Sequence, residues 1–312
     1  MKCILCDSKN FDIVTNKLRN NIKRNVVRCK NCKLTSLENP ESDLINYKND
    51  YRKFHSPIIG KQLSPKEFFD YELQFQQDRI ERIKNLLNFE YDVLEIGSST
   101  GHFLHSIKNS VNSVTGIELD ENFANFAKDN CGLTIFQEPL EKINFNGKKF
   151  DIIFLFQVFE HISNPIFLLN EIKKHLKNDG IIHLEVPNLN DALLSVYNID
   201  EFSEFYFRLP HVYYYDKSSL TKLLEMQDFE GKVSFHQEFS FFNHIHWLQN
   251  KSPQKDQKHA SELPSWKLQD NKSMNLKKWF SKIDQEYKQL LKNNEISEVL
   301  TYTGKLKNNN SL

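Results

Sequence analysis

The sequence has no excess of charge of one sign and no long apolar run, and each absence removes a class of protein. Its 312 residues carry 41 Lys and Arg against 41 Asp and Glu, so the formal net charge is zero. A neutral chain lacks the general attraction to phosphate backbones and anionic membranes that a basic protein has. The longest apolar stretch, around residues 152–156, is far too short to cross a bilayer. Neither nucleic acid nor a membrane span is therefore expected.

A secretion signal is also missing. The opening residues, MKCILCDSKN, contain no apolar segment followed by a small-residue cleavage site, and we therefore expect a cytoplasmic protein. The 39% hydrophobic and 26% charged residues are typical of a globular protein. The length allows one large domain or two smaller ones.

Cysteine is scarce, with five residues in all, but four of them form two Cys-x-x-Cys pairs, namely Cys3, Cys6, Cys29 and Cys32. Two such pairs can present four thiolates to one tetrahedral Zn²⁺ ion. Strand-like stretches between the pairs indicate a zinc-ribbon-like module over residues 1–40. Four protein ligands leave no open coordination position, so the zinc is expected to be structural. Disulfides do not suit the expected compartment.

From residue 61 onward, strand-like apolar runs alternate with helical patterns, which predicts βαβ units and a parallel sheet. A helix with Pro65 in its first turn is expected over 65–87. The predicted strands lie at 93–96, 114–119, 133–136, 152–156 and 181–186. The predicted helices lie at 103–107, 123–127 and 166–176, the last ending at Gly180. The fold class is therefore α/β, with a Rossmann-like sheet.

The flanking regions complete the predicted organisation. Residues 41–90 are expected to form a linker and a helical lid, 91–245 the catalytic domain, and 246–312 a partly helical extension. Asp216 is predicted to cap a helix. The aromatic segment 236–248, HQEFSFFNHIHWL, suggests closing strands, and 276–291 suggests a helix. Tryptophans in this part of the chain, Trp247, Trp266 and Trp279, are candidates to cap a substrate pocket or to form a dimer contact.

The stretch VLEIGSSTGHFL, residues 93–104, puts a small-residue turn between a strand and a helix. In an open parallel sheet this is where nucleotide-like ligands bind. Gly97 and Gly101 do not form the G-x-G-x-x-G fingerprint of dinucleotide-binding proteins, which leaves an NAD-dependent oxidoreductase as a lower-ranked alternative. Glu118, at the end of the next strand, suits the hydroxyls of a ribose. The pattern therefore predicts a site for an adenosyl cofactor.

Four motifs stand in order: EIGSSTG, GIELD, FQEPLEKI and FDIIFLFQVFEHISNP. Together they resemble class I S-adenosylmethionine-dependent methyltransferases, in the branch of ubiquinone-biosynthesis O-methyltransferases and of sugar methyltransferases with an N-terminal zinc-binding module. The resemblance implies a seven-stranded sheet and S-adenosylmethionine as cofactor. It also implies a cofactor-binding set consisting of Glu95, Gly97, Ser99, Gly101, Glu118, Glu138, Leu140 and Gln157.

Two histidines are candidate general bases. His161 follows the fourth strand in a Glu160-His161 pair, and its pKa range suits proton removal from a hydroxyl; alternatively the pair only braces its loop. His211, which opens HVYYYD, is the second candidate. The resembling ubiquinone-pathway enzymes hold a divalent metal with a carboxylate where this chain has Gln157. A neutral amide is a poor ligand for a hard cation, so catalytic magnesium is not expected.

The acceptor is the least defined part of the prediction. The resemblance favours a small molecule, namely a sugar, a nucleotide-sugar or a surface-polysaccharide unit. O-methylation is favoured over C-methylation, because sugar C-methyltransferases usually carry a long further α/β domain. The alternatives are a zinc-ribbon binding protein and a methyltransferase of RNA or protein, although the zero net charge disfavours RNA.

Overall fold

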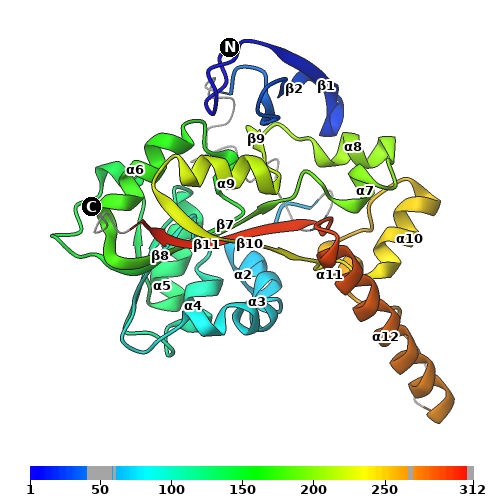
Figure 1. Ribbon diagram of the computed structural model, residues 1–312. Coiled ribbons are helices and arrows are strands. Elements are labelled where there is room, and N and C mark those ends of the chain that lie inside the picture. Colours follow the sequence, from blue (N-terminus) through cyan, green and yellow to red (C-terminus); the bar gives the residue numbers. More distant parts are fainter. Residues whose placement is uncertain (41–57, 59–60, 266–269, 308–312) are drawn as a thin grey trace.

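A seven-stranded sheet forms the centre of the computed structural model, which describes residues 1–40, 58, 61–265 and 270–307 (Figure 1). The strand order is β10-β11-β8-β7-β4-β5-β6. The strands are β4 Asp92–Ile96, β5 Ser113–Ile117, β6 Thr134–Phe136, β7 Phe150–Phe156, β8 Leu176–Pro187, β10 Phe229–His236 and β11 Val299–Leu306. The pairs from β6 to β8 are parallel, and β11 is antiparallel to both neighbours. The predicted α/β class is confirmed.

Helices cover both faces of this sheet, because the central strands are apolar on both sides. In β7, Ile153 and Leu155 join one hydrophobic core, while Ile152 and Phe154 join the other. One face carries α2 Pro65–Leu73, α3 Gln76–Ile83, α4 His102–Ile107 and α5 Glu121–Cys131 (Figure 1). The other carries α6 Pro165–His175 and α9 Lys217–Glu225. As predicted, the Asp216 side chain caps α9.

The helix expected over 65–87 begins as predicted but is interrupted. The Ser64 hydroxyl and the Glu67 carboxylate form a reciprocal capping box, and Pro65 lies in the first turn. Gln74 and Phe75 form a turn that separates α2 from α3, although both residues keep right-handed helical backbone angles, and the 3₁₀ turn η2 Lys84–Leu86 follows. Two short helices can pack on α4 and α5 at different angles. The predicted linker over 41–60 lies almost entirely outside the described residues.

The predicted helix end at Gly180 is wrong. Helix α6 ends at His175, and Leu176 is already extended with φ −79° and ψ 141°. Strand β8 then runs through the lysine-containing segment and pairs with β7 on both sides of a register shift. Hydrogen bonding to the neighbouring strand overrides the local preference of a Lys-Asn-Asp-Gly sequence for a helix terminus.

The closing strands predicted at 236–248 are also wrong. Most of that segment forms helix α10 Phe241–Asn250, which the Ser240 side chain caps. The closing strand is instead β11, which lies beyond the predicted domain end at 245. The predicted helix at 276–291 is present within α12 Asn271–Asn293, which projects from the body of the protein (Figure 1). Trp279 on this helix is 55% exposed, and Trp266 lies outside the described residues.

The N-terminal module joins the catalytic part through a second sheet with the order β1-β2-β3-β9. Its elements are β1 Phe11–Leu18, the 3₁₀ turn η1 Arg19–Asn21, β2 Ile22–Cys29, β3 Thr35–Leu37 and, from the catalytic part, β9 Tyr213–Tyr214. The Leu37 N–H donates to the Val212 carbonyl at 2.9 Å, which extends the connection. The module is therefore hydrogen-bonded to the segment that carries His211.

The shorter helical elements are η3 Leu140–Lys142, η4 Phe159–His161, α7 Ala192–Ser195, α8 Asp200–Tyr206 and α11 Gln257–Ser261. Of the helices in the described part of the chain, none combines the length and apolarity that spanning a membrane requires.

Candidate functional site

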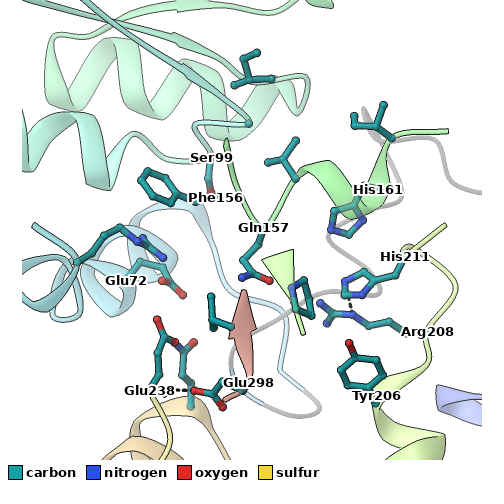
Figure 2. A pocket seen from close by; sticks show the side chains of 18 of the residues that line it. Glu72, Ser99, Phe156, Gln157, His161, Tyr206, Arg208, His211, Glu238 and Glu298 are labelled. Atoms are coloured by element: carbon teal, nitrogen blue, oxygen red, sulfur yellow. Dashed lines mark hydrogen bonds between the residues drawn. The ribbon is translucent and has the colours of Figure 1, made fainter. Parts of the chain in front are cut away.

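A cavity of about 690 Å³ opens at the carboxyl ends of β4, β5 and β7, where the strand order changes direction (Figure 2). Its walls come from α2 and α3, the β4–α4 turn, the segment after β7, α8, α10 and the turn of the N-terminal module. In Figure 2, Ser99 and Gln157 lie between Glu72 and the His161–His211 pair. A single cavity thus contains both the predicted cofactor turn and both predicted bases.

The β4–α4 turn needs glycine at its first position. Gly97 has φ 78°, and a Cβ atom there would lie 2.4 Å from the Cγ2 atom of Val158. Gly97 and Ser99 line the cavity. Gly101 also has a positive φ and caps α4, but it packs against Leu133 and is not among the residues that line the cavity. Gly101 therefore supports the conformation of the turn without facing the cavity.

Glu118 fastens the turn to the end of β5. One oxygen of its carboxylate accepts the Ser99 N–H at 2.8 Å, and the other accepts the Asp120 N–H at 2.7 Å. The side chain is 9% exposed and lines the cavity. Since a carboxylate oxygen can accept more than one hydrogen bond, this geometry also suits a ribose hydroxyl.

Glu95 lies at the end of β4 with a buried oxygen, Oε2, that has no hydrogen-bond partner among the described residues. Burial raises its pKa to about 8, and the nearby Arg79 opposes that increase. Arg79 itself pairs with Glu185 at 3.5 Å. A buried carboxyl group with an unused acceptor fits the ammonium group of an amino-acid moiety, as S-adenosylmethionine carries.

Of the two residues expected to contact adenine, one lines the cavity and the other does not. Leu140 lines it together with Pro139 and Glu141, whereas Glu138 is not among the lining residues. Gln157 lines the cavity with φ 55°, and its N–H donates to the Glu185 carbonyl at 2.8 Å. The strained backbone at Gln157 thereby lies between the turn and the histidines.

The two predicted bases lie against each other, although they are far apart in sequence. The rings of His161 and His211 meet edge to face with centroids 4.7 Å apart. The buried Glu160 carboxyl lies 3.7 Å from the Nε2 atom of His161 and 3.8 Å from that of His211. Burial raises the pKa of Glu160 to about 8.

Hydrogen bonds fix the tautomer of each histidine. The Nδ1 atom of His161 lies 2.8 Å from the Pro210 carbonyl, which can only accept, so Nδ1 carries the proton and Nε2 is the basic nitrogen. The Arg208 Nε–H donates to the Nε2 atom of His211 at 2.8 Å, so that lone pair is engaged (Figure 2). The two imidazoles are thus not equivalent as bases.

Glu160, His161 and His211 also place three ligand atoms within 4.8 Å of one another. Two imidazoles and a carboxylate can hold a transition metal. Here, however, the guanidinium of Arg208 donates to His211 at the nitrogen that would bind the ion. A fixed cation at that position disfavours a metal.

Apart from Trp247, the residues of the far wall of the cavity were not predicted from the sequence. Its lining residues include Asp191, Tyr206, Trp247, Glu238 and Glu298. One oxygen of Glu298 accepts the N–H groups of Glu238 and Phe239, while the buried Oε2 atom has no partner in the described part of the chain. Burial raises the pKa of Glu298 well above its usual range. Trp247 lines the cavity and Trp279 is not among its lining residues, while Trp266 lies outside the described residues.

The four N-terminal cysteines converge. The Sγ atoms of Cys3 and Cys32 are 3.3 Å apart, those of Cys6 and Cys29 are 3.5 Å apart, and all four lie within 4.8 Å of one another. Four converging thiols with no open position fit a structural zinc ion. The fifth cysteine, Cys131, is buried elsewhere, in α5.

Comparison with known proteins agrees with this geometry. Residues 52–232 match the family model described as "Methyltransferase domain". The ubiquinone biosynthesis O-methyltransferase of Haemophilus ducreyi is 28% identical over 110 residues, which cover 32% of this chain and 47% of that protein. The tRNA U34 carboxymethyltransferase of Nautilia profundicola is 31% identical over 112 residues, covering 33% and 37%. The chain spans about half the length of the curated relatives it matches, or less.

A solved structure described as a SAM-dependent methyltransferase from Archaeoglobus fulgidus superposes with a TM-score of 0.48 at 17% identity, covering 76% of this chain and 99% of that one. The family match extends over more than half of the chain and includes the glycine turn, Glu118, Gln157 and His161. The chain therefore belongs to the methyltransferase domain family, in its class I, S-adenosylmethionine-dependent group.

Proposed function

We propose that this chain transfers a methyl group from S-adenosylmethionine to a hydroxyl group of a small carbohydrate acceptor, namely a sugar, a nucleotide-sugar or a surface-polysaccharide unit. The observation that carries the proposal is the continuity of one cavity from the Gly97 turn to His161. A donor on one side of Gln157 and an acceptor on the other would share that space. S-adenosylmethionine supplies an activated methyl carbon, so the protein's main task is to hold the acceptor in line.

The cofactor would occupy the side formed by β4 and β5. Glu95 is assigned to the methionine ammonium group, because its buried Oε2 atom has no hydrogen-bond partner within the part of the chain that the structure describes. Gly97 and Ser99 are assigned to the methionine backbone, Glu118 to the ribose and Leu140 to the adenine. Gly101 retains only a supporting role for the turn, and Glu138 is left without one, since neither lines the cavity.

His161 is assigned as the general base. The hydrogen bond from Nδ1 to Pro210 leaves Nε2 as the nitrogen that accepts the hydroxyl proton. The carboxyl group of Glu160 lies 3.7 Å from that nitrogen, and its ionised form would stabilise the imidazolium that forms. His211 is assigned to positioning, because its Nε2 atom already accepts a hydrogen bond from Arg208.

The carbohydrate class rests on the far wall. A sugar presents hydroxyl donors together with an apolar ring face, and this wall offers a buried carboxyl oxygen on Glu298 and the ring of Trp247. Hydroxyl groups would satisfy the carboxyl oxygen, and the aromatic surface would pack on the ring face. The zinc ion assigned to the four cysteines would keep the N-terminal module folded.

A specific experiment tests the cofactor half of the proposal. Glu118→Ala should weaken S-adenosylhomocysteine binding in a calorimetric titration, because the ribose loses its acceptor. Glu121→Ala is the matched control, since Glu121 is an exposed acid in the first turn of α5, outside the cavity. Unchanged affinity in the Glu118 variant would remove this residue from the ribose role.

The acceptor half is tested by turnover. We expect methylation of nucleotide-sugars or free sugars in a panel assayed by mass spectrometry. The relative that modifies tRNA makes RNA the competing acceptor. Methylation of RNA, with a salt-sensitive complex and no reaction on any sugar, would replace the proposed substrate class.

A further inference from the structure

The turn of the zinc module reaches into the methyltransferase cavity. Arg19, the first residue of η1, donates its backbone N–H to the Phe207 carbonyl at 2.7 Å. Its Nε–H donates to the Phe205 carbonyl at 2.6 Å, and its guanidinium carbon lies 3.5 Å from the centre of the Phe205 ring. These contacts fix the side chain against the end of α8, and Arg19 lines the cavity.

No carboxylate pairs with Arg19 among the residues that the structure describes. The side-chain hydrogen bond to Phe205 uses Nε, which leaves the two terminal nitrogens of the guanidinium for a ligand. Burial, together with the neighbouring cation of Arg208, lowers the pKa of Arg19 to about 8. Two cations that face one cavity destabilise each other, and a bound anion would relieve that cost.

Tyr206 adds a second observation at the same place. Its side chain is 8% exposed and its buried hydroxyl has no hydrogen-bond partner in the described part of the chain. In Figure 2 this hydroxyl points toward Arg208. A buried hydroxyl donor without an acceptor requires one from a ligand or water. The nearby Glu160 does not supply a charge that cancels the cations at neutral pH, because its pKa is raised to about 8.

The cavity also continues outward past Arg19. A shallower groove of about 200 Å³ shares Arg19, Phe205 and Trp247 with the main cavity and adds Asn20 and Lys251. Glu204 lines this groove as well, but its carboxylate pairs with Lys17 at 3.1 Å. An acceptor longer than a monosaccharide could therefore extend out of the cavity between the guanidinium of Arg19 and the rings of Phe205 and Trp247.

We propose that Arg19 and Tyr206, assisted by Arg208, form a subsite for a phosphate group of the acceptor, so that the zinc module selects phosphate-bearing substrates. This inference rests on the proposed function and narrows its substrate class to sugar phosphates and sugars linked to a nucleoside diphosphate. The planar fork of an arginine matches two oxygens of a phosphate group. The outward groove provides room for the part of the acceptor beyond the phosphate.

The test is a calorimetric titration of inorganic pyrophosphate into full-length, zinc-loaded protein saturated with S-adenosylhomocysteine. Arg19→Gln should weaken pyrophosphate binding by about tenfold or more, the range expected for loss of a charge-assisted hydrogen bond. Lys23→Gln is the matched control: it makes the same charge change on an exposed residue of the same module, outside both cavities. We expect its affinity to stay within about twofold of the parent protein.

Further variants and a second anion distinguish the possible results of this titration. Tyr206→Phe should weaken pyrophosphate binding less than Arg19→Gln, and Arg19→Lys keeps the comparison valid if the Gln variant does not fold. Equal pyrophosphate affinity in the Arg19 variants and the parent would overturn the subsite. Malonate that binds as tightly as pyrophosphate would overturn the choice of phosphate over carboxylate. Failure to bind S-adenosylhomocysteine would instead count against the proposed function, whereas intact cofactor binding without pyrophosphate binding would reject this inference alone.

Discussion

Replacing Gly97 by alanine tests the geometry of the cofactor turn most sharply. The substitution brings two separate costs. Alanine at φ 78° is strained, by about 1–3 kcal/mol. Its Cβ would also lie 2.4 Å from Val158 Cγ2, and crowding of this kind costs about 1–3 kcal/mol. Since the turn lines the cavity, part of this strain should appear as weaker cofactor binding.

The structure offers a control for each cost. Gly132 has φ 65° but nothing within 4 Å of an added Cβ, so Gly132→Ala carries the conformational strain without the clash. Val158→Ala removes the methyl group that the new Cβ meets. In urea unfolding, Gly97→Ala should destabilise the protein by about 1–3 kcal/mol more than Gly132→Ala. The double variant with Val158→Ala should regain a similar amount relative to additivity.

Calorimetric titration with S-adenosylhomocysteine supplies the functional readout. Gly97→Ala should bind it at least about tenfold more weakly, while Gly132→Ala should bind normally, because Gly132 lies outside the cavity. The reasoning is refuted if Gly97→Ala costs no more stability than Gly132→Ala, or if Val158→Ala gives no rescue.

Three further predictions concern other parts of the molecule. Glu95 has a pKa of about 8 in the free protein and is therefore mostly protonated at pH 7. Because a cofactor ammonium group would favour the ionised form of Glu95, S-adenosylhomocysteine binding should release up to one proton. Calorimetry in buffers of different ionisation enthalpy would detect this proton, and Glu95→Gln should abolish its release. Replacing both Cys29 and Cys32 by serine should remove zinc and lower stability, whereas Cys131→Ser should keep the metal content; zinc that survives the double change would rule out the ribbon site. His161→Gln should retain cofactor affinity and lose about 10²–10⁴-fold in kcat, with a smaller loss for His211→Gln, and a near-normal rate would assign proton removal elsewhere.

Much of the sheet could be predicted because its signals are local. The apolar run of β7 and the turn after β4 are each contained in a short stretch of sequence, and the first-turn proline Pro65 and the capping residue Asp216 also act locally. Strand β11 could not be predicted in the same way. It pairs with β8 and β10, which lie far from it in the chain, and its position depends on that distant register.

The site shows the same limit. His161 and His211 could each be proposed from their own segments. Their ring contact, however, depends on the pairing of β9 with β3 in the four-stranded sheet, which fixes the segment that carries His211. Glu298 and Arg19 belong to no local motif. Glu298 directly precedes β11 and Arg19 begins η1, and these distant segments meet at one cavity only in the folded protein. Local sequence therefore predicts the proposed cofactor side of the cavity, while the proposed acceptor side is assembled by long-range topology.

The most direct test of the account is a calorimetric titration of the zinc-loaded protein with S-adenosylmethionine, S-adenosylhomocysteine and NAD in parallel. We expect micromolar binding of the first two ligands and none of NAD, because the turn lacks a dinucleotide fingerprint and the buried Glu95 carboxyl group suits an ammonium group. Binding of NAD, or no binding of either adenosyl ligand by folded protein, would contradict it.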